Sequence, residues 1–120
     1  MKYLIKIYTI LIFLIIFTSK SYSSEKIKIG LVIPLSGENK DLGQSILKSV
    51  RLAINDINDD RIQIIPKDNK NDPDETLKVS SDLYNSGIRI IIGPVFNKNT
   101  KKLDKLNSDL TFISFTNKIH

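Results

Sequence analysis

Cysteine is absent from the 120 residues of this chain, and histidine occurs once, as His120 at the last position. Without cysteine the chain has no disulfide framework, no thiol nucleophile and no residue that could accept a lipid after an export signal. A single histidine at the terminus gives little material for general acid–base chemistry, which needs a titratable group held in a site. These absences argue against a catalytic function.

Two binding motifs are also missing. The chain contains no G-x-x-x-x-G-K-[ST] sequence, and Gly30, Gly37 and Gly43 do not form G-x-G-x-x-G, so no phosphate-binding loop is indicated. The acidic stretch "DNKNDPDE" fails as a calcium loop because, counted from Asp68, positions three and six are Lys70 and Pro73. Helix capping and solvation account for these acids, so we expect no metal and no cofactor.

The basic charge of the chain is concentrated at its N-terminus. Lys2, Lys6 and Lys20 lie in residues 1–23, which contain no acid, so residues 24–120 carry 15 basic and 13 acidic groups, a net charge of +2. Without a basic stripe along the chain or interleaved aromatic residues, the electrostatic footprint of nucleic-acid binding is missing. We therefore expect no nucleic-acid partner.

The N-terminal segment is typical of a secretory signal. Lys2 and Lys6 precede an uncharged apolar run over residues 7–17, and Ser21 and Ser23 place small residues where a signal peptidase reads them. We predict that residues 1–23 form a signal peptide, cleaved near Ser23, and that the mature chain is periplasmic and not a lipoprotein. The alternative is a membrane anchor formed by residues 7–17, although a spanning helix needs ~20 apolar residues.

The mature chain alternates between strand-like and helix-like periodicity. Residues 26–34, 61–66, 88–92 and 110–115 are predicted strands. A helix is predicted from Leu42 to Ile57, with Asp41 and Gln44 as a capping box, and a short helix over residues 100–107.

The helix between the second and third predicted strands has signals at both ends. Asp72 is the predicted N-cap, Pro73 takes the first helical position, and Gly87 is the predicted left-handed stop. Its inner face is predicted to carry Leu77, Ser80 and Tyr84.

This order predicts an α/β fold with a parallel sheet, covered by helices on both faces, and a strand order of 2-1-3-4. In such open sheets a ligand binds outside the carboxyl ends of the strands, where the strand order reverses. The loops concerned are "PLSGENKD" (34–41) and "GPVFNKNT" (93–100), and Gly93 allows the chain to turn sharply where the third strand ends. These loops are the predicted walls of a ligand cleft.

Three stretches of the chain carry a resemblance to a known family: "KIKIGLVIPLSGENKDLGQSILKSVRLAINDIN", "DNKNDPDETLKVSSDLYNSGIRIIIGPVFNKNT" and "FISFTNK". In order and spacing over residues 27–117 they resemble the first lobe of the type I periplasmic binding proteins, the leucine/isoleucine/valine receptors of ABC transporters. The resemblance implies a flavodoxin-like three-layer lobe, a second lobe across a hinge, and an amino acid-like small molecule enclosed between them. It also implies an ABC permease as partner and no enzymatic activity.

Carried over position by position, the resemblance implies ligand contacts from three places. Leu42 stands where many members present an aromatic side chain, and Phe96 and Asn97 stand where a hydroxyl and a backbone N–H take the ligand carboxylate. The loop after the fourth strand supplies the rest, with Ser114, Thr116 and Asn117. In this chain an aliphatic side chain replaces the aromatic one, and Asn97 replaces a small hydroxyl residue.

The "GPVF…FISFTN" pattern also resembles the penicillin-binding protein activators of the same superfamily, which implies a cell-wall synthase as an alternative partner. A phosphoacceptor site of the response-regulator kind would need an acid at the end of the third strand, where Gly93 stands. Because a cleft receptor needs two domains of ~100–200 residues each, we expect residues 24–120 to be a partial N-terminal lobe, from a truncated gene or a fragment.

Overall fold

The centre of the molecule is a sheet of four parallel strands, ordered β2-β1-β3-β4, as the sequence predicts. The strands are β1 (Ile27–Ile33), β2 (Ile62–Asp68), β3 (Ile90–Ile92) and β4 (Thr111–Ile113). The computed structural model describes residues 1–17, 24–106 and 109–115. β1 is exposed at its start and fully buried from Leu31 to Ile33, so the core surrounds the carboxyl half of this strand.

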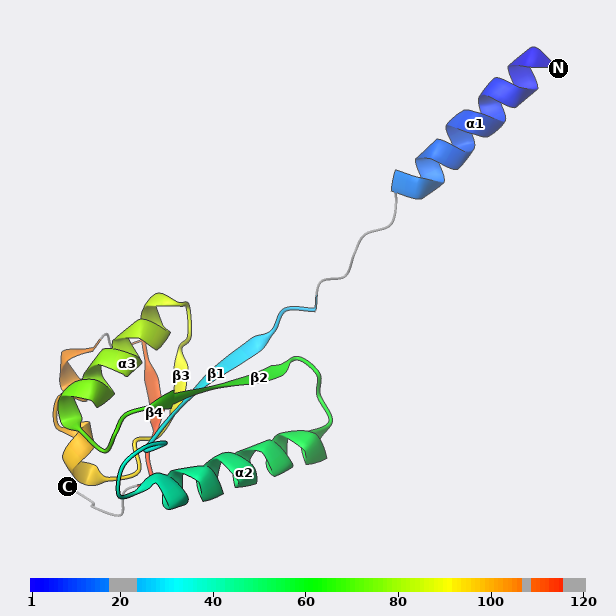
Figure 1. Cartoon of the computed structure of the whole chain (residues 1–120). Helices are drawn as coiled ribbons and strands as arrows, with labels where there is room; N and C mark the ends of the chain where they lie inside the picture. The colour runs from blue at the N-terminus through cyan, green and yellow to red at the C-terminus, as the bar shows by residue number, and fades with distance from the viewer. Residues whose placement is uncertain (18–23, 107–108, 116–120) are drawn as a thin grey trace.

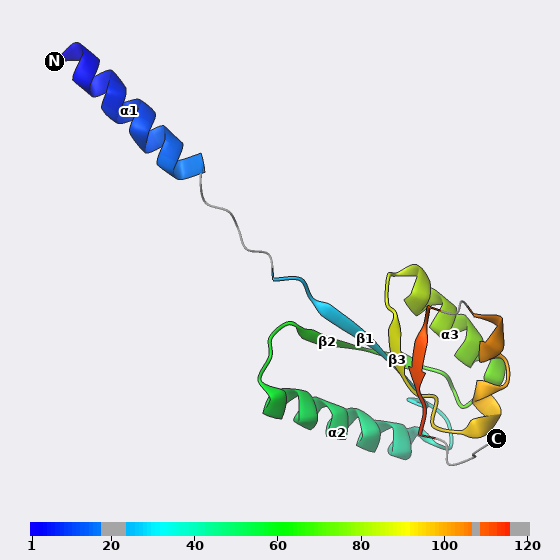
Figure 2. The ribbon, with the colours of Figure 1, turned by 180° about the vertical axis from the view of Figure 1, so that it is seen from behind.

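Two helices cover opposite faces of the sheet, α2 (Lys40–Ile57) and α3 (Pro73–Asn85), which makes three layers (Figures 1 and 2). Because side chains alternate along a strand, Leu31 and Ile33 pack with Leu47 of α2, whereas Val32 packs on the other side with Leu83 of α3. The three-layer α/β fold is therefore confirmed.

α3 begins as the sequence predicts. The Asp72 carboxylate accepts hydrogen bonds from the N–H groups of Asp74 (2.9 Å) and Glu75 (2.8 Å), and Pro73 occupies the first turn. These bonds satisfy two backbone donors that have no partner inside the helix.

The C-terminus of α3 is also as predicted. Gly87 has a φ of +87°, its N–H donates to the Tyr84 carbonyl (2.9 Å), and the N–H of Ile88 donates to the Leu83 carbonyl (3.1 Å). This pair of bonds is a Schellman motif. It directs Ile88 into the core, beside Leu83.

The inner face of α3 is only partly the predicted one. Ser80 is fully buried, but Leu77 and Tyr84 are half-buried, and the other buried positions are Thr76, Val79 and Leu83. The prediction failed because Thr76 is buried and accepts a hydrogen bond from the buried Asn69. The spacing of apolar residues gives no sign of such a polar contact.

The predicted capping box of α2 is wrong. The helix begins at Lys40, after Asn39, whose side chain makes no capping hydrogen bond, and Asp41 lies within the first turn. The helix starts earlier because the Asn39 carbonyl already accepts the N–H of Gly43 (3.2 Å). Asp41 instead places a negative charge at the positive end of the helix dipole.

The predicted helix over residues 100–107 is replaced by two short 3₁₀ helices, η1 (Asn97–Thr100) and η2 (Leu103–Lys105). The bonds from Asn99 N–H to the Phe96 carbonyl (3.0 Å) and from Leu106 N–H to the Leu103 carbonyl (2.9 Å) each span three residues, which is 3₁₀ geometry. β3 and β4 are shorter than the predicted strands, and β2 extends beyond its predicted end at Pro66. That proline is tolerated because β2 is an edge strand.

An N-terminal helix, α1 (Lys2–Phe17), lies apart from the lobe (Figure 1). Within the described ranges, no helix combines the length and hydropathy needed to cross a membrane.

Candidate functional site

The candidate site is the carboxyl edge of the sheet, where the chain leaves β1, β3 and β4. The N–H of Gly93, just after β3, donates to the Ile113 carbonyl at the end of β4 (2.8 Å), and the Ser114 hydroxyl donates to the Pro94 carbonyl (3.0 Å). Leu35, after β1, and Val95, after β3, pack against the same apolar cluster. Three loops far apart in the sequence therefore converge at one edge.

Two glycines allow backbone to pack directly on backbone at this edge. A Cβ atom at Gly43 of α2 would lie 1.7 Å from the Pro34 carbonyl oxygen, and one at Gly93 would lie 2.1 Å from the Val32 carbonyl oxygen. Gly93 also has a φ of +110°, which side chains disfavour. The predicted role of Gly93 as a sharp turn is confirmed, and Gly43 brings the start of α2 against the end of β1.

A carboxylate that sequence reasoning missed anchors the loop after β1. Asp68, the last residue of β2, accepts hydrogen bonds from the N–H groups of Leu35 (2.8 Å) and Lys70 (2.9 Å). Burial raises the pKa of Asp68, but hydrogen bonds from the Ser36 side chain and from the backbone of Lys70, Leu35 and Ser36 outweigh burial and lower the pKa below its usual value. The group is therefore an ionised anchor and not a proton donor at neutral pH.

A buried group of neutral polar side chains, the amide cluster, supports η1 from below. It consists of Asn69, Asn71, Thr76 and Asn99, and of these Asn69, Thr76 and Asn99 are fully buried. Asn69 donates through its Nδ2 to the Thr76 hydroxyl (3.0 Å) and accepts from the Asn71 N–H (3.1 Å), and Asn99 donates through its Nδ2 to Asn71 Oδ1 (2.9 Å). The cluster thereby connects the loop after β2 to the loop after β3.

The amide cluster also reaches β1, because the N–H of Asn69 donates to the Ile33 carbonyl (3.1 Å). The tight turn that makes this possible has Lys70 and Asn71 in the left-handed region, with φ of 52° and 55°. The run "DNKND" carries a signal for such a turn, since Asn and Asp tolerate this conformation and bond to nearby backbone, although it does not show that Asn69 is buried.

The structure places four of the six predicted site residues. Leu42 lies in the first turn of α2 and is 43% exposed, one turn before Ile46, which packs on the sheet. Phe96 and Asn97 are half-buried at the start of η1, and Ser114 joins the loop after β4 to Pro94. Thr116 and Asn117 lie outside the described residues.

Asn97 is fixed by its own helix turn. The Thr100 hydroxyl lies 2.8 Å from the Asn97 carbonyl oxygen and 3.3 Å from Asn97 Oδ1. These contacts orient the side chain of Asn97 at the end of the sheet, where amide and hydroxyl groups could hydrogen-bond a polar ligand. Among the described residues, no group of three His, Cys, Asp or Glu side chains could hold a metal ion.

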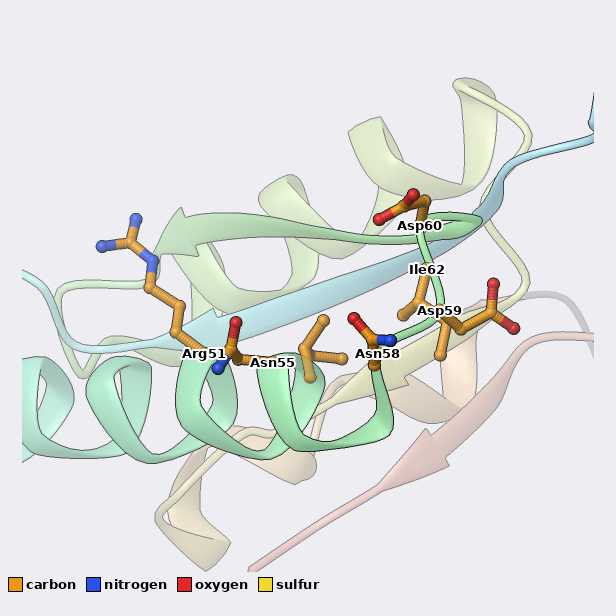
Figure 3. A pocket seen from close by; sticks show the side chains of 7 residues that line it. Arg51, Asn55, Asn58, Asp59, Asp60 and Ile62 are labelled. Atoms are coloured by element: carbon orange, nitrogen blue, oxygen red, sulfur yellow. The ribbon is translucent and has the colours of Figure 1, made fainter.

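A pocket of about 330 Å³ lies at the opposite, amino edge of the sheet, between the last turns of α2 and the start of β2 (Figure 3). Its lining includes Arg51, Asn55, Asn58 and Asp59. Side-chain hydrogen bonds from Arg61 to the Asp59 carboxylate lower the pKa of Asp59 to about 2. This pocket is far along the strands from the loops that follow β1 and β3, so it is separate from the candidate site.

The four-stranded parallel sheet of order β2-β1-β3-β4, with helices on both faces, agrees with the family that the sequence matches. A family model described as periplasmic binding protein matches residues 26–109. The chain therefore belongs to the periplasmic binding protein family. No curated protein matches it.

Solved structures with the same fold come from several bacteria. An ABC transporter substrate-binding protein from Sphaerobacter thermophilus superposes with a TM-score of 0.69 at 21% identity, covering 75% of this chain and 26% of that protein. The branched-chain amino acid transporter substrate-binding protein LivJ from Streptococcus pneumoniae, solved with isoleucine, gives a TM-score of 0.60 at 26% identity, covering 75% of this chain and 28% of LivJ.

A third similar structure is the C-domain of LpoA from Haemophilus influenzae, a regulator of PBP1A. Its TM-score is 0.60 at 20% identity, over 72% of this chain and 27% of that domain. The chain thus spans about a quarter of the length of each of these three proteins.

Proposed function

We propose that this chain is part of the first lobe of an extracytoplasmic solute receptor of an ABC transporter, which binds an amino acid or similar small solute between two lobes. One observation carries the proposal: the loops after β1, β3 and β4 converge at the carboxyl edge. The Gly93–Ile113 and Ser114–Pro94 hydrogen bonds join the loops after β3 and β4, and Leu35, after β1, packs against the same apolar cluster as Val95. The family match and the likeness to an isoleucine-bound receptor support it. The proposed ligand contacts are Leu42, Phe96, Asn97, Ser114, Thr116 and Asn117.

The carboxyl edge offers the chemistry that such a ligand needs. Leu42, exposed on α2, and the half-buried Phe96 provide apolar surface, and Asn97 provides an amide fixed by Thr100. Binding sites bury ~70–90% of a small ligand, and one lobe covers only one side of it. We therefore expect millimolar or undetectable binding of branched-chain amino acids by the 120-residue chain, and measurable binding once a second lobe is present.

Calorimetric titration with isoleucine tests this proposal on three proteins: the chain alone, the chain extended by a second lobe, and the extended chain carrying Asn97→Ala. Asn55→Ala is the matched control, because Asn55 lines the pocket at the opposite edge. We expect Asn97→Ala to weaken binding by about tenfold, the effect of losing one hydrogen bond to a charged group, and Asn55→Ala to leave it unchanged. Tight binding by the 120-residue chain alone would refute the half-site model.

The alternative function, activation of a cell-wall synthase, is favoured by one feature. Leu42 is an aliphatic side chain at the position where receptors of this kind often present an aromatic one, and it is 43% exposed. An extended chain that binds no amino acid but captures a peptidoglycan synthase would support this function and exclude the receptor.

The proposal includes the division of the chain into an export signal, residues 1–23, and a partial lobe, residues 24–120. The family is extracytoplasmic, which agrees with an export signal. Mass spectrometry of the periplasmic fraction should detect a mature N-terminus near Ser24. A membrane-extracted chain that still starts at Met1 would instead support the anchor formed by residues 7–17.

A further inference from the structure

Lysine side chains gather on the outer side of η1 and η2. This lysine patch consists of Lys98, Lys101, Lys102 and Lys105, of which all but the half-buried Lys102 are exposed, and Asp104 is the one acidic residue among residues 98–105. These eight residues carry a net charge of +3. The rest of residues 24–120 keeps 11 of the 15 basic groups against 12 of the 13 acidic ones, a net charge of −1. The positive charge of the lobe is therefore local.

Buried residues that alternate with the lysines fix the backbone of η1 and η2, so that the lysine side chains face the solvent. Asn99 is fully buried in the amide cluster, and Leu103 is 8% exposed. In a 3₁₀ helix, residues three apart lie on the same side, so Lys98 and Lys101 stand next to each other. Lys102 forms an ion pair with Asp74 of α3, which also ties the segment to that helix. The patch is thus a fixed surface.

Three of the four lysines form no ion pair with a carboxylate among the described residues. Within the described ranges, the ion pair with Asp74 accounts for Lys102, and Lys98, Lys101 and Lys105 have no carboxylate within salt-bridge distance. Exposed charges that repel one another without a counter-charge favour the approach of an acidic surface, and such charges mainly accelerate association.

The position of the patch favours a soluble partner over a lipid surface. η1 follows β3 at the carboxyl edge of the sheet, whereas the N-terminal segment that would be inserted in a membrane enters at the amino edge, at Ile27 (Figure 1). In a parallel sheet these edges are opposite ends of the lobe. With residues 1–23 removed, as proposed above, nothing among residues 24–106 and 109–115 holds this end of the lobe against a membrane.

We propose that the lysine patch is a docking surface for an acidic segment of another protein. It does not depend on the solute site, because its lysines point outward from η1 and η2 whether or not a ligand is enclosed. Binding should be electrostatic and salt-sensitive, because exposed charges are screened over ~8 Å at 0.15 M ionic strength.

The probe for the test is a fluorescent 20-residue polyglutamate peptide, with binding to the 120-residue chain followed by fluorescence anisotropy at two salt concentrations. The patch variant is Lys98→Glu, Lys101→Glu and Lys105→Glu. The matched control is Lys28→Glu, Lys40→Glu and Lys48→Glu, which replaces three other exposed lysines and changes the net charge by the same amount. Lys102 is left in place because it pairs with Asp74.

We expect the patch variant to lose at least tenfold in affinity and the control to lose less than about threefold, since both have the same net charge and differ only in where the charge lies. Equal losses in the two variants would overturn the proposal. Stronger binding to phosphatidylglycerol vesicles than to the peptide, through the same lysines, would assign the surface to lipid and also overturn it. Unfolding midpoints measured by circular dichroism show whether each variant is folded. If the triple variant is not folded, the single variant Lys101→Glu must lose more affinity for the peptide than its control, Lys48→Glu.

Discussion

Replacing Gly43 by alanine separates the local preference of a helix from the packing of this lobe. Gly43 lies inside α2, where alanine is favoured over glycine by ~1 kcal/mol, so helix propensity alone predicts a more stable protein. In the structure, a Cβ atom at this position would lie 1.7 Å from the Pro34 carbonyl oxygen, whereas ordinary contacts begin at 3.4 Å. The helix would have to move away from β1 by about the difference.

The size of the destabilisation by Gly43→Ala follows from the atoms that surround Gly43. Overpacking costs ~1–3 kcal/mol, and the upper end applies because the opposing atom is backbone and has no alternative rotamer. After the gain of ~1 kcal/mol in propensity, we expect the free energy of unfolding to fall by ~2 kcal/mol, which for a lobe of this size lowers the melting temperature by roughly 10 °C.

Urea unfolding followed by far-ultraviolet circular dichroism measures this change. Ala53→Gly, at an exposed position of the same helix, is the control, and propensity alone should lower its stability by ~1 kcal/mol. If propensity dominated at both sites, the two variants would shift in opposite directions. A Gly43→Ala protein as stable as the original would show that α2 and β1 do not approach as closely as described.

Three further changes test other parts of the lobe by the same unfolding assay. Asp72→Ala removes the two capping bonds of α3 and should cost ~1 kcal/mol, with Asp72→Asn close to the original. Asp68→Asn should destabilise the lobe most near neutral pH. Because folding lowers the pKa of Asp68, its ionised form stabilises the fold above about pH 4, and this contribution is lost as the pH falls through the folded-state pKa. The stabilities of the Asp68→Asn variant and the original protein should therefore converge in acid. Asn99→Ala leaves Asn71 Oδ1 without its donor and should cost ~1–3 kcal/mol, whereas Asn55→Ala on the exposed side of α2 should change stability by less than ~0.5 kcal/mol.

The parts of the fold that the sequence predicts correctly depend on strong local signals. Asp72 and Pro73 start α3 and Gly87 ends it because capping chemistry is local, and the strand order follows from the alternation of strands and helices. The capping box at Asp41 and Gln44 failed because helical hydrogen bonding already begins at the Asn39 carbonyl. The start of α2 also packs through Gly43 on Pro34, just after β1, a contact that local capping signals do not show.

The candidate site shows the same division. Gly93 was predictable because a turn at the end of a buried strand needs a residue that accepts positive φ. Asp68, Asn69 and Asn99 were not, because polar side chains of these types are mostly exposed. Only the three-dimensional structure shows that Asn69 and Asn99 are fully buried and that Asp68 accepts the Leu35 N–H.

The amide cluster contains no side chain that titrates. None of the groups that bond within it, the amides of Asn69, Asn71 and Asn99 and the hydroxyl of Thr76, gains or loses a proton over the range in which proteins stay folded. The ion pair between Lys102 and Asp74, which holds the neighbouring η2 segment, is exposed to solvent and is therefore screened by salt. The hydrogen bonds that join the loops after β2 and β3 therefore persist when acidity and salt change, whereas the ion pair beside them weakens as the salt concentration rises.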